Sequence, residues 1–287
     1  MPDPALEQLL ERREVREQAS VVTAEVVERW TATFGAPWTG ADERVVPTLM
    51  FPTFARPVAP PRPGETAPTG VVLHDALKSS LDLPVAIAVG YELELVGDLR
   101  IGERLRSEER IAALGPERST RFGPGREWVI EVASSAADRL VGVERFRMLG
   151  YRPEASSDAG TGASSQRAAR AQQWSWSETI EVDAEWIRRS ATVNRVWAPA
   201  HHQSEAARRA GLADIIVDTS SQVAVMAAAA QRRHPDLHIA SVDLAMKRPI
   251  LPGSTVILRG RHAGRVVTVV ATVEEREMSR ADITFAG

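Results

Sequence analysis

The sequence predicts an α+β protein of two related halves, each an antiparallel sheet wrapped round a central helix. Two observations carry this prediction. A polar segment without apolar periodicity, residues 154–173, separates residues 1–153 from residues 174–287. Because structureless loops longer than about 12–15 residues are uncommon inside a compact domain, we interpret this segment as a linker between two domains. The same succession of strand, capping residue and helix then occurs in both halves.

The repeated succession is visible in two segments. In the first half, Thr23 follows a short apolar stretch and can cap a helix over residues 24–34, where apolar residues recur at helical spacing. In the second half, residues 174–182 alternate as a strand does, and Asp183 can cap a helix over residues 184–193. The match predicts two copies of one fold.

A central helix is predicted over residues 219–233, which are rich in alanine, begin with Thr and Ser and end in arginine. The alanines at 227–230 are too small to fill a core alone, so we expect a strongly curved sheet close around this helix. The counterpart in the first half follows His74 and is cut short by Pro84. We expect the two copies to differ at their central helices.

A glycine that forms a turn leads into a strand in each half, at Gly102 and at Gly253. Further β-rich runs follow these glycines. They are residues 126–134 and 140–149 in the first half and 264–275 in the second. Each half therefore ends in long antiparallel strands.

The composition limits the chemistry. The 287 residues are 44% hydrophobic, which suffices for sizeable cores, and they include no cysteine, so reactive groups must come from oxygen and imidazole side chains. A net charge of -3 without a basic face argues against nucleic-acid binding. No apolar run reaches the roughly 18 residues of a membrane span, and no signal-peptide pattern begins the chain. We expect a soluble, cytoplasmic protein without a metal or redox cofactor.

Three segments carry a resemblance to a known family. APAHHQSEAARRAGL (residues 198–212) is similar to the hydratase motif of MaoC-like (R)-specific enoyl-CoA hydratases and 3-hydroxyacyl thioester dehydratases. KRPILPGST (residues 247–255) resembles their Arg-Pro-Val-x-Pro-Gly-Asp segment, and residues 119–146 look like their N-terminal dehydratase domain. The resemblance covers nearly the whole chain and implies a tandem, or double, hot-dog fold. The residues on the motif pattern are Pro199, His201, Ala207, Gly211 and Leu212.

The resemblance also implies a catalytic arrangement. Hydration of an enoyl thioester needs groups that move protons and a donor for the thioester oxygen. The family uses an Asp and a His on one loop, and His201 falls on the histidine while Val196 stands at the aspartate position. Asn194 is a polar candidate near that position. Asp218, just before the central helix, is the candidate to supply the carboxylate beside His201, although a helix cap is its commoner role.

Substrate-binding candidates follow from the same resemblance. The N–H of Thr219 or Ser220 at the helix start would polarise the thioester carbonyl. Gly211 belongs to the motif. Arginine outnumbers lysine by 33 to 2, and we expect Arg248 and Arg121 to hold phosphates of coenzyme A or a phosphopantetheine arm, while most other arginines solvate the surface.

The predicted function is the reversible hydration of an enoyl thioester, or dehydration of a 3-hydroxyacyl thioester, carried by coenzyme A or an acyl carrier protein. Val196 leaves two alternatives open: a partner subunit that binds acyl thioesters without catalysis, and a hot-dog enzyme of altered chemistry, such as a thioesterase or a specialised biosynthetic dehydratase or cyclase. Since tandem copies already form a pseudo-dimer, a monomer, a homodimer and a complex with a partner hot-dog subunit all remain open.

Overall fold

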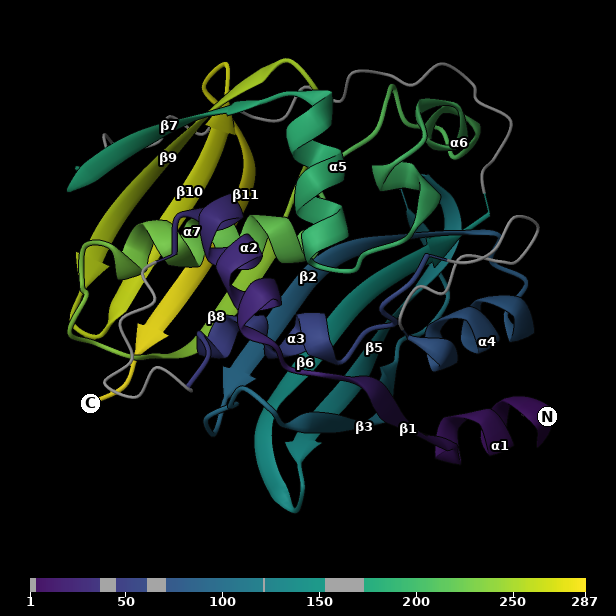
Figure 1. The fold of residues 1–287 in the computed structure, drawn as a ribbon. Coiled ribbons are helices and arrows are strands. Elements are labelled where there is room, and N and C mark those ends of the chain that lie inside the picture. Colours follow the sequence, from purple (N-terminus) through teal and green to yellow (C-terminus); the bar gives the residue numbers. More distant parts are fainter. Residues whose placement is uncertain (1–3, 37–44, 61–70, 121, 153–172) are drawn as a thin grey trace.

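The computed structural model describes residues 4–36, 45–60, 71–120, 122–152 and 173–287 (Figure 1). All of the predicted linker except Gln173 lies outside these residues. The first half contains, in order, α1 (Pro4–Glu11), β1 (Arg13–Val21), α2 (Ala24–Phe34), a 3₁₀ turn (Thr48–Met50), α3 (Phe51–Phe54), α4 (Val72–Ser80), β2 (Val85–Leu95), β3 (Arg104–Leu114), β4 (Arg118–Thr120), β5 (Gly123–Ala136) and β6 (Arg139–Tyr151).

The second half contains β7 (Trp176–Val182), α5 (Ala184–Val193), a 3₁₀ turn η2 (Pro199–His201), α6 (Ser204–Arg209), α7 (Thr219–Gln231), β8 (Ile239–Met246), β9 (Ser254–Ala263), β10 (Val266–Val273) and β11 (Arg276–Phe285). Its strands occupy the left of Figure 1 in green and yellow, and those of the first half occupy the centre and lower right in purple, blue and teal.

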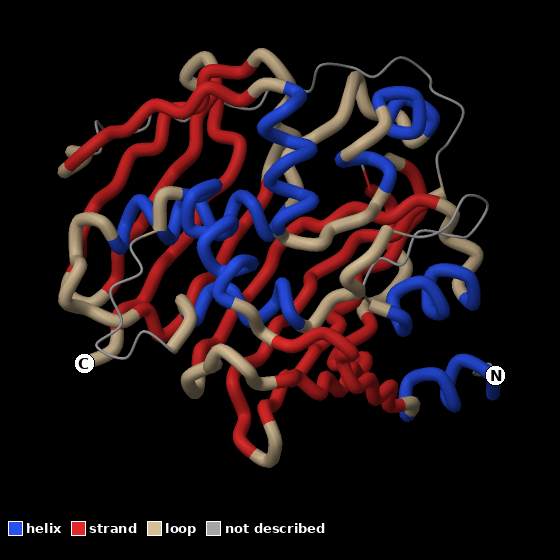
Figure 2. The backbone as a smooth tube through the Cα atoms, viewed as in Figure 1, coloured by secondary structure: helices blue, strands red, loops and turns tan. Residues whose placement is uncertain are grey.

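One antiparallel sheet runs through both halves, in the order β1-β3-β5-β6-β2-β8-β11-β10-β9-β7, with β4 paired to β5. The order reads as the same five-strand pattern from either edge. At the centre β2 pairs with β8, with Gly90 opposite Ala245. The expected α+β class and antiparallel sheets are confirmed, and the two sheets are continuous. The helices α2, α3, α5 and α7 lie together in the hollow of this curved sheet (Figure 2).

The repeated helices have the predicted bounds. Helix α2 covers residues 24–34 and α5 covers residues 184–193. The Asp183 carboxylate caps α5 by accepting from the N–H of Trp186 at 2.6 Å. Thr23 precedes α2 in an extended conformation, but its side chain makes no capping bond, so that part of the expectation is wrong.

The predicted glycine turns are equivalent. Gly102 (φ +93°) donates to the Val22 carbonyl at 2.9 Å, and Gly253 (φ +81°) donates to the Val182 carbonyl at 2.7 Å. The glycine therefore ties the start of β3 to the end of β1 in the first half, and the start of β9 to the end of β7 in the second. The positive φ angles explain why glycine occupies both positions.

Helix α7 is the central helix of the second half and packs against β8, β10 and β11. It ends at Gln231, two residues before the expected end. Residues 227–230 are completely buried alanines, which lets the surrounding elements approach closely on all sides. Its counterpart α4 has nine residues against thirteen and ends four residues before Pro84, as expected. Within the described part of the chain, no helix has the length and apolar character needed to cross a bilayer.

Candidate functional site

The loop between α5 and α7 brings His201 to the start of α7. The N–H of Ile216 donates to the Ala200 carbonyl at 3.2 Å, and the His201 Nδ1 lies 2.8 Å from the Ile216 carbonyl. Ile216 thus bonds two neighbouring residues of η2, through its N–H and through its carbonyl. The imidazole of His201 is therefore tied to the segment that enters α7, at a residue two positions before Asp218.

The hydrogen bond fixes the tautomer of His201. A carbonyl oxygen only accepts, so Nδ1 carries the proton and the neutral ring keeps its lone pair on Nε2. Burial lowers the pKa of His201 below its ordinary value, while the charge of Asp218 and the bond to Ile216 oppose this shift. The neutral ring is a base near pH 7, and Asp218 stabilises the imidazolium that forms when the ring takes up a proton.

Asp218 caps α7 and is 2% exposed. Its Oδ1 accepts from the N–H of Ser221 at 2.9 Å, and its Oδ2 accepts from the Ser221 hydroxyl. The capping role and the electrostatic interaction with His201 therefore coexist in one carboxylate. Each oxygen keeps a further lone pair, because a carboxylate offers about four acceptor positions.

Asn194 links this cap to the first half of the chain. It ends α5, is 2% exposed, and donates from Nδ2 to the Ser221 hydroxyl at 3.1 Å. Its Oδ1 accepts from Trp30 Nε1 at 2.9 Å and from the Thr53 hydroxyl at 3.4 Å. Asn194 thus positions the start of α7 through Ser221, and its amide is engaged by protein groups on both sides.

A second buried polar group lies behind Asn194. Arg56 donates to the Asn194 carbonyl at 3.2 Å and to Glu144 at 3.1 Å, and the Tyr91 hydroxyl donates to the same Glu144 oxygen at 2.6 Å. Burial raises the pKa of Glu144, which Arg56 opposes, and burial together with Glu144 raises the pKa of Tyr91. These residues come from the first half and support the site in the second, so no local sequence pattern reveals them.

Val196 lies beyond the end of α5, on the same loop as His201. Its carbonyl accepts from His202 Nε2 at 2.7 Å, and the His202 ring stacks on Trp197. His202 is therefore directed away from the bond that holds His201. Between Asn194 and Val196 the chain adopts a left-handed conformation at Arg195 (φ +55°), whose guanidinium lies 5.3 Å from the centre of the Phe54 ring. A non-glycine residue in this conformation stores strain, which the sequence did not indicate.

The start of α7 offers two N–H groups. Those of Ser221 and Gln222 are bonded to Asp218, whereas those of Thr219 and Ser220 have no acceptor among the described residues. Both residues are partly exposed. The first N–H groups of a helix, at the positive end of its dipole, favour an oxygen that carries negative charge.

The other predicted residues lie further from this centre. Gly211 follows α6 with φ +83° in an exposed turn. Arg248 is exposed, donates to the Glu277 carbonyl at 2.9 Å, and lies two residues before Ile250, which lines the pocket described next. Arg121 falls outside the described residues.

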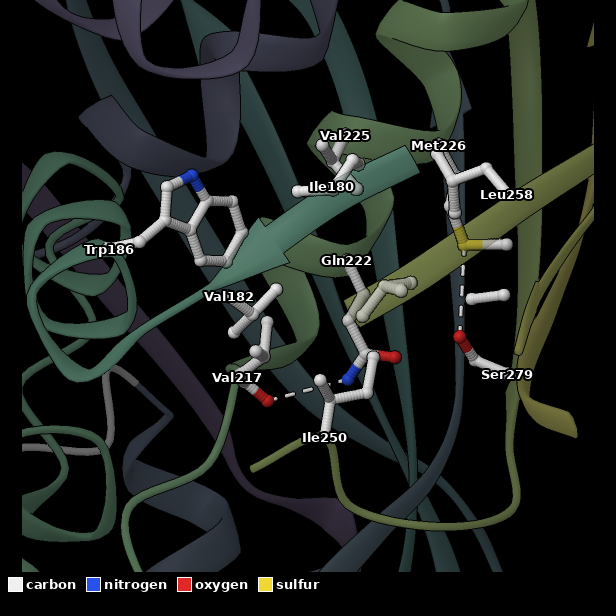
Figure 3. Close-up of a pocket in the computed structure, with 12 residues that line it drawn as sticks. Ile180, Val182, Trp186, Val217, Gln222, Val225, Met226, Ile250, Leu258 and Ser279 are labelled. Atoms are coloured by element: carbon white, nitrogen blue, oxygen red, sulfur yellow. Dashed lines mark hydrogen bonds between the residues drawn. The ribbon is translucent and has the colours of Figure 1, made fainter. Parts of the chain in front are cut away.

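An apolar pocket lies between α7 and the wall formed by β7, α5 and the sheet (Figure 3). The empty space in and in front of this half-open pocket, open solvent included, is about 300 Å³. Val217 and Gln222, which flank the start of α7 in the sequence, belong to its lining, whereas His201, Thr219 and Ser220 do not. The other lining residues are Ile180, Val182, Trp186, Val225, Met226, Ile250, Val256, Leu258, Ala271 and Ser279. Over the described ranges, no three His, Asp or Glu side chains converge as metal ligands do.

Comparison with known proteins adds to this geometry. No protein-family model matches the chain, and no curated protein matches its sequence. Among solved structures, a MaoC-like dehydratase from Phytophthora capsici superposes with a TM-score of 0.71 at 11% identity, over 98% of both chains. A protein of Mycobacterium tuberculosis with a double hotdog fold gives 0.59 at 15% identity, over 96% of both chains.

The chain has a double hot-dog fold. The predicted fold is therefore confirmed over nearly the whole chain. A protein described as an oleoyl thioesterase from Lactobacillus plantarum also superposes, with a TM-score of 0.54 at 9% identity over 96% of both chains. At such identities the likeness concerns the fold, and the chemistry has to be argued from the site.

Proposed function

We propose that the chain catalyses reversible hydration of enoyl thioesters of the (R)-specific type, equivalently dehydration of 3-hydroxyacyl thioesters. The observation that carries the proposal is the placement of His201. The bond to the Ile216 carbonyl fixes its tautomer and leaves the lone pair of Nε2 available. The ring also interacts electrostatically with Asp218, at a helix start that has two free N–H groups. The fold likeness to a MaoC-like dehydratase supports the same chemistry.

In the dehydration direction, His201 Nε2 takes the proton from the α-carbon. The electron pair of that C–H bond forms an enolate, whose oxygen accepts from the N–H of Thr219 or Ser220. The enolate then collapses to the double bond as the C3–O bond breaks, and the imidazolium returns the proton to the departing hydroxyl, giving water. Asp218 supplies the carboxylate that stabilises the imidazolium between these steps. The reaction is metal-independent and needs no redox cofactor.

The start of α4 in the first half supports the proposed role of the α7 N–H groups in polarising the thioester carbonyl. There, the buried Glu109 carboxylate accepts hydrogen bonds from the N–H groups of Val72 and Leu73, the first two residues of α4. Thr219 and Ser220 are the equivalent residues of α7. A helix start in this fold thus binds a charged oxygen in one half, and in the other half the same positions are available to substrate.

The substrate is proposed to be an acyl thioester of coenzyme A or of an acyl carrier protein, with Arg248 near the phosphates. We also propose a cytoplasmic location. Val196 favours one rival, an acyl-thioester-binding partner subunit without catalysis, since a valine moves no proton. The likeness to an oleoyl thioesterase gives some support to a second, hydrolytic chemistry on the same fold.

A mass-spectrometric assay separates these functions. Purified protein and its His201→Ala variant are incubated with a panel of enoyl and 3-hydroxyacyl thioesters on pantetheine and coenzyme A. Gain or loss of one water, reduced by about 10²–10⁴-fold in the variant, is expected. Release of free acid instead would indicate a thioesterase, and binding without any product would indicate the partner subunit; either result overturns the proposal.

A further inference from the structure

The cap of α7 contains one hydrogen bond more than a helix cap needs. Asp218 accepts from the N–H of Ser221 at 2.9 Å, and this bond by itself completes an N-terminal cap. The same carboxylate also accepts from the hydroxyl of Ser221. Because Ser221 is completely buried, the second bond is shielded from water. The hydroxyl bond therefore has a role other than capping.

Two other helix starts of the chain do without such a bond. Asp183 caps α5 by accepting from the N–H of Trp186, the third residue of that helix, at 2.6 Å, and a tryptophan has no hydroxyl to add. At α4 the residue before the helix is Val71 and the third residue is His74, and no side chain caps the helix. Among these three helix starts, the hydroxyl bond occurs only at α7.

The direction of the hydrogen bonds around Ser221 is fixed by the groups that make them. Trp30 Nε1 only donates, so Asn194 turns Oδ1 toward Trp30 and Nδ2 toward Ser221. The Ser221 oxygen accepts from Nδ2 at 3.1 Å, which directs its own proton to Oδ2 of Asp218. All four side chains are buried. Asp218 is therefore held as an acceptor through a chain of bonds that begins in the first half.

We infer that Ser221 is a positioning residue, whose hydroxyl, oriented by Asn194, holds the Asp218 carboxylate ionised and in one orientation beside His201. This inference rests on the proposed function, in which His201 is the base, and it adds a residue to that site. Ser221 takes no part in proton transfer, because its hydroxyl is used by Asp218. It acts on the base only through the carboxylate.

The pKa of His201 is the property that this arrangement sets. Burial lowers it, the charge of Asp218 and the bond to Ile216 raise it, and the neighbouring His202 lowers it. A donor to a carboxylate draws off part of its negative charge, so Asp218 without the Ser221 hydroxyl attracts a protonated imidazole more strongly. The Ser221 N–H and the helix dipole still keep Asp218 ionised. Loss of the hydroxyl therefore raises the pKa of His201, whereas loss of the Asp218 charge lowers it.

An NMR titration of the histidine rings tests the inference on the whole chain without substrate. The His201 signal is identified by its absence in His201→Ala. The titration midpoint of His201 is expected to move to higher pH in Ser221→Ala and to lower pH in Asp218→Asn, relative to the wild type. The acid limb of kcat/KM is expected to follow the same order. A residue that only fills space would not produce these opposite shifts.

Two further variants complete the test. Ser190→Ala is the matched control, since Ser190 is also completely buried but its hydroxyl bonds the Ile187 carbonyl within α5. It is expected to leave the midpoint of His201 in place. Ser221→Cys keeps a side chain of similar size with a much weaker donor, so the midpoint is expected to move as in Ser221→Ala, by less. This variant keeps the test decisive if Ser221→Ala disturbs the packing.

A His201 midpoint that stays in place or moves to lower pH in the two Ser221 variants overturns the inference, as does an equal shift in Ser190→Ala. This failure is distinguishable from failure of the proposed function. Water addition to an enoyl thioester with an unmoved midpoint leaves the function standing without the role of Ser221. Opposite shifts in a protein without turnover leave the role of Ser221 toward Asp218 standing and remove the function.

Discussion

The two halves of this chain treat the start of their central helices in opposite ways. In the first half, the Glu109 carboxylate fills the start of α4, where it accepts from Val72 and Leu73 and pairs with Arg16. In the second half, Asp218 caps α7 from the side and leaves the N–H groups of the first two residues available. The same fold thus closes one helix terminus and leaves the other open.

The burial of Glu109 shows what closing the terminus requires. The side chain is completely buried, and burial raises the pKa of its carboxyl, while Arg16 and the two helix N–H groups lower it. The first half therefore carries an internal anion with its own counter-charge. In the second half the buried carboxylate at α7, that of Asp218, bonds Ser221 instead of the first two N–H groups, and the neighbouring base, His201, is supplied by a loop. In the proposed function, the copy with the open helix start acts on the substrate and the other copy serves as support.

Among substitutions at the two helix starts, the largest effect on kcat is expected from Thr219→Pro. Proline is tolerated at the first helical position and removes only the N–H, and Asp218 already has the extended conformation that a residue before proline prefers. The value of kcat is expected to fall about 10²-fold with an unchanged melting temperature.

Val72→Pro is the matched variant in the first half. It removes a donor to Glu109, so it is expected to lower stability while sparing kcat. A folded Thr219→Pro protein with unaltered kcat would contradict the polarising role of the Thr219 N–H. Steady-state kinetics and thermal melts measure both variants.

Asn194→Ala tests the link between the halves. It leaves the buried Trp30 Nε1 without an acceptor and Ser221 without a donor, so we expect a loss of about 2 kcal/mol in the free energy of unfolding. A fall in kcat larger than any change in KM is expected, because the start of α7 loses its support. Urea unfolding and kinetics provide the measurement.

Thr192→Ala on the same helix is the control for Asn194→Ala. The Thr192 hydroxyl is exposed and bonds only within α5, so the change is expected to alter stability by less than about 0.5 kcal/mol. Equal changes in stability and kcat for the two substitutions would show that Asn194 does not support the start of α7.

The pH dependence of kcat/KM sharpens the role of Asp218. His201 acts as a neutral base, so the rate falls on the acid side as the ring becomes protonated, below the ordinary histidine pKa of 6.5. Since Asp218 raises this pKa, Asp218→Asn is expected to move the acid limb to still lower pH. An acid limb that stays in place or moves to higher pH would contradict the electrostatic coupling between Asp218 and His201. Asp214→Asn, on the same loop, is the control and is expected to leave the acid limb in place.

The smallest effect is expected from Arg248→Ala. An exposed arginine near a phosphate contributes at most about 1 kcal/mol, so KM for coenzyme A thioesters is expected to rise roughly two- to fivefold. KM for pantetheine thioesters, which lack those phosphates, is expected to stay the same. An equal rise in KM for both substrates would show that Arg248 does not contact the phosphates.

Local signals in the sequence predicted what is local in the structure. The bounds of α2 follow from periodicity, those of α5 from periodicity and the cap at Asp183, and the turns at Gly102 and Gly253 from the backbone freedom of glycine. The repeat of these signals was enough to predict two copies of one fold. The continuity of the sheet depends on pairing of β2 with β8, which no periodicity encodes.

The candidate site shows the same division between local and distant signals. His201 and Asp218 were singled out from a motif and a helix start, and the structure places them in electrostatic reach of each other. The residues that hold the start of α7 come from distant positions: Trp30 and Arg56 lie 164 and 138 residues before their common partner Asn194. Such contacts form only when the two halves and their helices are packed, so a single sequence does not reveal them.

The most direct test of the account compares one histidine from each half. His201 lies at the open helix start, and His74 lies buried in α4, against Trp128, in the closed half. The initial rate of water addition to an enoyl thioester is measured by mass spectrometry for the wild type, His201→Ala and His74→Gln, with each rate referred to folded protein. The account predicts that His201→Ala loses at least about 10²-fold while His74→Gln retains the wild-type rate; an undiminished rate in His201→Ala would contradict it.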